Sequence, residues 1–148
     1  MDKHGIRTRI TEGKKEIFDP VRCRYIACTP EEIVRQTYLL YLIHQLHVPK
    51  IAVAVEKQII YNHLVRRYDI VVFSKGKCLL IAECKAPSVE LSEDTLSQIA
   101  AYNSVMQAKY IVLFNGRQEL ICKKTDNLYL PCEKLPVYSQ WTSEQVNK

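Results

Sequence analysis

The sequence is poor in glycine and contains no long apolar run. Four glycines and six prolines among 148 residues exclude collagen-like repeats, and 47% hydrophobic with 25% charged residues excludes a disordered chain. The longest apolar run, at residues 38–43, is far shorter than the roughly 18–20 residues that cross a bilayer. The first residues carry charges but no apolar signal segment, so we expect a single-domain cytoplasmic protein without a membrane span.

Zinc-type cysteine spacing and a nucleotide-binding loop are also missing. The six cysteines include no Cys-x-x-Cys pair, and Cys78, Cys84 and Cys122 lie in apolar runs. We therefore expect free thiols rather than disulfides or a zinc site. The four glycines cannot form a Gly-x-x-x-x-Gly-Lys-Ser/Thr loop, so we expect no ATP-driven motor in this chain alone. The formal net charge of +5 is compatible with a partner that carries phosphate but does not identify one.

Local patterns predict the order of helices and strands. Thr29 and Pro30 are typical of a helix start, Ser92 can cap a second helix, and Asn115-Gly116 is a strong hairpin signal. The expected elements are a loosely ordered basic arm at 1–16, a small hairpin around Asp19-Pro20, a helix from Thr29 to about Leu46, strands at 51–61, 68–73 and 78–85, a helix from Ser92 to about Ala108, and strands at 110–114 and 118–122.

This order predicts an α/β (α+β) fold with a central mixed β-sheet flanked by helices. From the helix at Thr29 onward, the elements follow one another as helix-strand-strand-strand-helix-strand-strand. The strands are apolar almost throughout, which indicates that both faces of the sheet are covered. We place the single domain at 17–140 and a tail at 141–148.

Three charged residues mark the ends of two neighbouring predicted strands. Glu83 and Lys85 are two residues apart, so they share a strand face, and Asp69 begins the preceding strand. Two carboxylates at a sheet edge can hold Mg²⁺, and a nearby lysine can orient or deprotonate the attacking water and stabilise charge on phosphate oxygens. An ordinary ion pair at a strand end explains Glu-x-Lys alone equally simply.

The two carboxylates meet only if the hairpin between them is irregular. A four-residue loop over 74–77 would pair Phe73 with Cys78 and Asp69 with Ala82, which turns Asp69 to the wrong face. A bulge or an odd-length loop would place Asp69 opposite Glu83. We predict that register shift.

These residues resemble the signature of the PD-(D/E)XK nucleases. Asp69 and Glu83-x-Lys85 match the signature, and Gln98 with Tyr102 resembles the Gln-x-x-x-Tyr motif of its exonuclease-like and restriction branches. Tyr68 departs from the pattern, because it replaces the proline before the first acid. As a set, the matches over about 17–130 are similar to the N-terminal nuclease domain of type I restriction enzyme R subunits, in a small stand-alone version; they also include Thr29–Gln36, Val55-Glu56-Lys57, Ala86-Pro87 and Phe114-Asn115-Gly116.

The resemblance implies a restriction-endonuclease-like core and a deoxyribonuclease that depends on Mg²⁺ or Mn²⁺. Asp69 and Glu83 would bind the metal together with the backbone carbonyl of Cys84, and Lys85 would serve the attacking water. An acid of the first helix would complete the site. Glu32 is our choice and Glu31 the alternative, while a capping role for Glu32 remains open.

The resemblance also implies contacts with DNA. Gln98 and Tyr102 share a helix face that the family turns toward the metal site and the DNA backbone, although Tyr102 can instead pack on the sheet. Arg66 and Arg67 are either phosphate contacts or a solvated basic turn, and Glu56 lies either near the site or on an ordinary strand surface. Expected partners are DNA, a second copy of the chain, or a separate motor or specificity subunit. The alternative function is a module of nuclease fold that binds nucleic acid or a partner protein without cutting.

Overall fold

A small antiparallel sheet opens the chain in the computed structural model, which describes residues 5–103 and 106–143. Its strands are β1 (Thr8–Thr11), β2 (Lys14–Asp19) and β3 (Arg24–Ala27), so the predicted hairpin around Asp19-Pro20 is confirmed. The expected loose arm is wrong for residues 8–16, which form β1, a turn and the start of β2. Arg7 and Arg9 lie over the rings of Phe18 and Tyr25, and these cation–π contacts help to order the segment.

Helix α1 (Pro30–Leu40) begins where the sequence predicts. The Thr29 hydroxyl accepts a hydrogen bond from the backbone N–H of Glu32, and Pro30 occupies the first helical position. The helix continues as a π-helix, η1 (Tyr41–Gln45), and ends close to the expected residue. A short 3₁₀ helix, η2 (Lys50–Ala52), then leads into the main sheet.

The main sheet has six strands in the order β4-β5-β6-β7-β8-β9. Strands β6 and β7 run parallel and the other neighbours run antiparallel, which confirms the predicted mixed sheet. The parallel pair is possible because α2 (Glu93–Tyr102) lies in the connection between β6 and β7. The strands are β4 (Val53–Tyr61), β5 (Leu64–Ser74), β6 (Lys77–Cys84), β7 (Tyr110–Phe114), β8 (Glu119–Thr125) and β9 (Leu128–Cys132).

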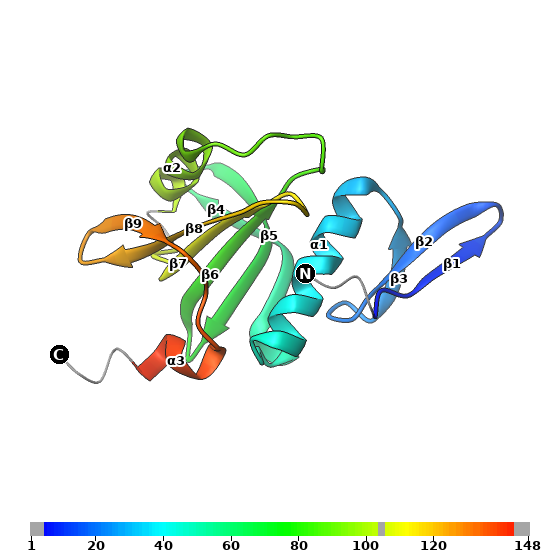
Figure 1. Cartoon of the computed structure of the whole chain (residues 1–148), viewed down its shortest axis with the longest axis horizontal. Helices are drawn as coiled ribbons and strands as arrows, with labels where there is room; N and C mark the ends of the chain where they lie inside the picture. Colours follow the sequence, from blue (N-terminus) through cyan, green and yellow to red (C-terminus); the bar gives the residue numbers. More distant parts are fainter. Residues whose placement is uncertain (1–4, 104–105, 144–148) are drawn as a thin grey trace.

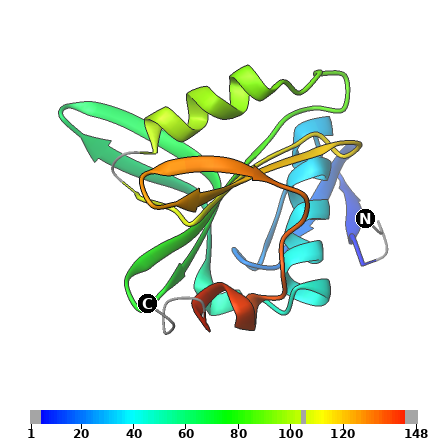
Figure 2. The same ribbon diagram turned by 60° about the vertical axis from the view of Figure 1, so that its left-hand side comes forward.

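Helices cover both faces of the main sheet (Figure 1). Helix α1 and the short α3 (Tyr138–Ser143) lie on one face, and α2 crosses the other (Figure 2). Helix α2 is capped by Ser92 as predicted, but it ends at Tyr102 rather than near Ala108. Strand β9 and helix α3 are absent from the sequence prediction. Trp141 of α3 is fully buried and donates its indole N–H to the carbonyl of Pro136, so the first residue of the tail placed at 141–148 packs in the core.

A β-bulge sets the register between β5 and β6. Lys75 and Gly76 form a tight turn with φ of 51° and 76°, and Phe73 pairs with Cys78 beyond it. Val72 then pairs with Leu80, which leaves Leu79 as the extra residue. Ile70 consequently pairs with Ala82, and one further step places Asp69 opposite Glu83. The predicted register shift is confirmed.

Strands β5 and β6 part directly after this point. Their pairing ends at Ile70, and the rest of β5 pairs with β4 alone. The chain beyond β6 stays with β7 instead, because the N–H of Lys85 donates to the carbonyl of Phe114 over 2.8 Å. Asp69 and Glu83 therefore lie at the fork between the two strands.

The state of the cysteines and the length of the helices were also predicted from the sequence. All six cysteines are free, and Cys78, Cys84 and Cys122 are buried. Among the helices that the structure describes, none is long and apolar enough to span a membrane.

Candidate active site

Asp69 and Glu83 lie together at the fork between β5 and β6. The Asp69 carboxylate accepts a hydrogen bond of 2.8 Å from the backbone N–H of Cys84, so it ties the end of β6 to β5 where the regular ladder stops. Burial raises the pKa of Glu83 to about 8, and the charge of Asp69 and a hydrogen bond with it add to the effect; Lys85 opposes it. Without a metal ion, burial and the neighbouring Asp69 therefore favour the protonated form of Glu83.

This pair has the chemistry of a divalent-cation site. A cation would replace the proton of Glu83 and neutralise both carboxylates, and the Cys84 carbonyl offers a third oxygen at the same strand end. In residues 5–103 and 106–143, no three side chains of His, Cys, Asp or Glu are grouped so as to hold a metal by themselves. A cation held here would take most of its ligands from water, as Mg²⁺ is able to do.

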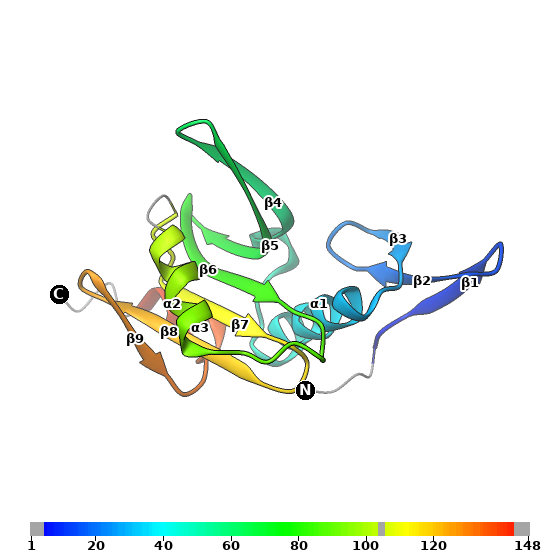
Figure 3. The ribbon, with the colours of Figure 1, turned by 90° about the horizontal axis from the view of Figure 1, so that it is seen from above.

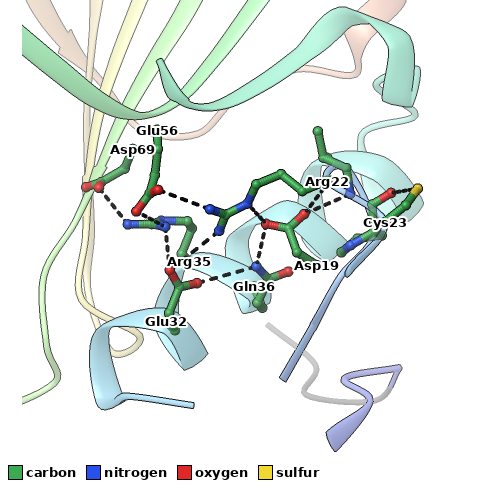
Figure 4. Close-up of polar contacts among 10 residues, drawn as sticks. Asp19, Arg22, Cys23, Glu32, Arg35, Gln36, Glu56 and Asp69 are labelled. Atoms are coloured by element: carbon green, nitrogen blue, oxygen red, sulfur yellow. Dashed lines mark hydrogen bonds and ion pairs between the residues drawn. The ribbon is translucent and has the colours of Figure 1, made fainter. Parts of the chain in front are cut away.

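Arg35 of α1 reaches the same aspartate from the helical side. Its guanidinium contacts Asp69 Oδ1 and Glu56 Oε1, each over 3.0 Å, and also pairs with Glu32 (Figure 4). The Arg35 side chain is only 6% exposed, so one buried cation joins three carboxylates from α1, β4 and β5. No motif in the sequence marks Arg35 as a member of the site. The only signal was its position on the helix face of Glu32 and Gln36.

Arg22 extends this network to the small sheet. It binds the fully buried Asp19 over 2.8 Å and Glu56 over 3.0 Å, and Asp19 also accepts a hydrogen bond from Gln36 (Figure 4). Glu56 has a φ of 48°, which is unusual within a strand. We call Asp19, Arg22, Glu32, Arg35, Gln36, Glu56 and Asp69 the arginine network.

The pKa values of two carboxyl groups in the arginine network shift in opposite directions. Burial raises the pKa of Glu32, and Glu56 adds to the increase, although Arg35 and Arg22 oppose it. Burial also acts to raise the pKa of Glu56, but the hydrogen bond and charge of Arg35, together with Arg22, outweigh it and lower that pKa. Within the arginine network two arginines face four carboxylates, and the charge of Arg67 also acts on Glu56.

The structure brings together most of the residues that the sequence places in the site. Lys85 acts electrostatically on Glu83, and Glu32 is linked to Asp69 through Arg35. Glu31 is exposed, but its charge contributes to the raised pKa of the Cys84 thiol, so it also lies near the end of β6; Glu32 is the acid of α1 that belongs to the arginine network. Its carboxylate pairs with Arg35 and Gln36. Glu56 belongs to the cluster and not to an ordinary strand surface.

The predicted DNA-contacting residues fall into two groups. Arg66 and Arg67 lie within β5 and not in a turn, and strand alternation points them to opposite faces. The Arg66 guanidinium lies 3.6 Å from the ring centre of Tyr102, which is 51% exposed and hence not packed into the core. Gln98 is exposed one turn earlier in α2, and within the described part of the chain no hydrogen bond joins it to Asp69 or Glu83.

A mixed sheet with helices on both faces, and an acid pair and a lysine where two central strands part, is consistent with an α+β domain of nuclease-like fold. The chain belongs to the family described as type I restriction enzyme R protein N terminus (HSDR_N), whose model matches residues 30–136. The match begins at the first residue of α1 and includes the whole six-stranded sheet. A search of curated proteins gave no match.

Proposed function

We propose that this domain hydrolyses DNA phosphodiester bonds with the help of Mg²⁺ or Mn²⁺. The observation that carries the proposal is the coupled pair of Asp69 and Glu83 at the fork, with Lys85 two residues further on. Membership of a restriction-enzyme family supports DNA as the substrate and other subunits as partners. A second copy of the chain would cut the other DNA strand, or a separate motor or specificity subunit would move along the DNA or select the sequence. The location that we propose is the cytoplasm.

Each residue has a distinct role in this proposal. Asp69, Glu83 and the carbonyl of Cys84 would hold the metal, which would supply an activated water and offset charge on the phosphate. Lys85 would orient the attacking water and donate a hydrogen bond to a phosphate oxygen. Arg35 would fix the rotamer of Asp69 and hold Glu32 beside the site. Gln98 would face the DNA backbone.

We expect the wild-type protein to cut DNA and the Lys85→Ala protein to do so at least ~100-fold more slowly, because the substitution removes the cation that meets charge developing on the phosphate. The assay uses plasmid, linear and single-stranded DNA with Mg²⁺ or Mn²⁺. Lys77→Ala is the matched control, since Lys77 is an exposed lysine at the other end of β6. Equal rates for wild type and Lys85→Ala would contradict the proposal.

The second candidate is a module that binds nucleic acid or a partner protein without cutting. It is favoured by the engagement of Asp69, whose carboxylate is bound both by Arg35 and by the N–H of Cys84. In that case the protein binds DNA but does not cleave it in the presence of Mg²⁺ or Mn²⁺. The same assay separates the two functions, provided that binding is measured beside cleavage.

A further inference from the structure

The distal half of the β4–β5 hairpin extends beyond the rest of the main sheet. Strand β5 pairs with β6 only over Ile70–Ser74, whereas its pairing with β4 continues to the turn at Asn62-His63. Residues 57–68 therefore form a two-stranded ribbon, which Figures 2 and 3 show reaching past α2 and away from the other strands. We call this segment the ribbon.

The composition of the ribbon is suited to a polyanion with apolar surface. It carries Lys57, Arg66 and Arg67 and contains no acidic residue, and the strand register places Arg67 on the face opposite to Lys57 and Arg66. Ile60, Leu64 and Val65 are 71%, 63% and 56% exposed, which is unusual for large apolar side chains of neighbouring residues. Positive charge beside exposed apolar side chains is a combination that suits duplex DNA, where phosphates flank a major groove that presents thymine methyl groups.

The two faces of the ribbon have different surroundings. On one face Arg66 stacks on Tyr102, and Ile59 and Tyr68 pack in the core beneath α2. This face anchors the ribbon to the domain. The opposite face carries the cross-strand pairs Gln58 with Arg67 and Ile60 with Val65, and all four of these side chains are exposed.

The open face leads directly to the candidate active site. Arg67 is two residues before Asp69, about 7 Å away at the rise of a strand, and the Arg67 charge acts on the carboxylate of Glu56. Val65 lies two residues further out, about 13 Å from Asp69. A duplex with one phosphate at the fork would therefore extend along this face.

We propose that the ribbon enters the major groove of duplex DNA with its open face. The inference rests on the proposed nuclease function and adds the element that holds the substrate. A major groove about 12 Å wide admits a two-stranded β-ribbon. Arg67 binds a phosphate, Gln58 reaches base edges, and Ile60 and Val65 contact thymine methyl groups or other apolar base surface. Arg66 is a positioning residue, since it fixes the ribbon on Tyr102.

Binding is tested without cleavage, by fluorescence anisotropy in EDTA with a labelled 20-base-pair duplex of mixed sequence and the corresponding single strand. We expect Ile60→Ser/Val65→Ser to weaken duplex binding at least tenfold and to affect the single strand less. Arg67→Ala weakens duplex binding and makes the negative slope of log affinity against log salt shallower by about one. Lys77→Ala is the charge-matched control and stays within twofold of wild type. Thermal melts verify that each variant is folded. Because the substituted ribbon residues are exposed, we expect their melting temperatures to match that of the wild type.

The outcomes separate this inference from the proposed function. Ribbon variants that bind the duplex as wild type does overturn the inference even if Lys85→Ala abolishes cutting. Equal losses on duplex and single strand also overturn it, because a groove exists only in the duplex. If no protein cuts DNA but the ribbon variants lose duplex binding selectively, the inference stands and the proposed nuclease function fails.

Discussion

The Arg35→Ala protein is expected to lose about 3–5 kcal/mol of its free energy of unfolding, the usual effect of removing one partner from a buried ion pair. Arg35 is almost fully buried and pairs with Glu32, Glu56 and Asp69, so its removal leaves three carboxylates that repel one another. Urea denaturation measures the loss. Arg9→Ala is the control, because Arg9 contacts Glu16 and the Tyr25 ring at the surface, so its removal should lower the free energy of unfolding far less.

The deficit of Arg35→Ala should depend on pH. Burial already raises the pKa of Glu32, and loss of the opposing Arg35 charge raises it further. A carboxyl group with a raised pKa holds its proton more tightly in the folded state, so its contribution to stability falls as pH rises from the unfolded to the folded pKa. The deficit is therefore smaller at pH 5 than at pH 8. A loss below 1 kcal/mol, or one that does not change with pH, would contradict this account.

The Glu83→Gln protein is expected to lose both its DNA cleavage, by about a thousandfold or more, and its response to metal. Mg²⁺ should raise the melting temperature of wild type more at pH 8 than at pH 6, because below pH 8 the ion competes with the proton on Glu83. The amide that replaces the Glu83 carboxylate in the variant carries no charge to offer the ion, so this shift should disappear. Thermal melts in EDTA or Mg²⁺ between pH 5 and pH 9 provide the measurement.

Metal-free Glu83→Gln should also be less sensitive to pH than wild type. An unfolded glutamate ionises near pH 4.3, whereas folded Glu83 keeps its proton to about pH 8. At this carboxyl group the folded state thus binds more protons across this range, so the contribution of Glu83 to wild-type stability falls as pH rises through it. Glu133→Gln, which alters an exposed carboxylate, should keep the wild-type profile. Identical pH profiles for Glu83→Gln and wild type would rule out the coupled acid pair.

Short-range signals predicted much of the fold. Thr29 and Pro30 located the start of α1, and Asn115-Gly116 located the β7–β8 turn, where Asn115 accepts hydrogen bonds from the N–H groups of Arg117 and Gln118. Strand β9 escaped prediction because Pro131 within it argues against a strand, and the six residues of α3 are too few for a clear helical period. The burial of Trp141 depends on neighbours that no local pattern names.

The candidate site was predictable only in part. Asp69, Glu83 and Lys85 are marked by charge within apolar strands, and their spacing required the shift that the bulge provides. The arginine network was not predictable, because Arg35 lies 21 residues from Glu56 and 34 from Asp69 in the chain. A Glu-x-x-Arg spacing also occurs on ordinary solvent-exposed helix faces, so the sequence could not distinguish a buried network from a surface pair.

The bulge at Leu79 sets which β6 residues lie opposite which β5 residues, and therefore which face of the sheet each later β6 side chain occupies. Leu79 lies four residues before Glu83 and is itself a buried apolar residue with no chemistry of its own. Removing this one residue would shift every later β6 residue by one place relative to β5 and turn Glu83 and Lys85 to the opposite face. All the acids and the lysine would remain in the sequence, yet the site would no longer exist. In this domain a residue count between two strands is as necessary to the chemistry as the charged groups themselves.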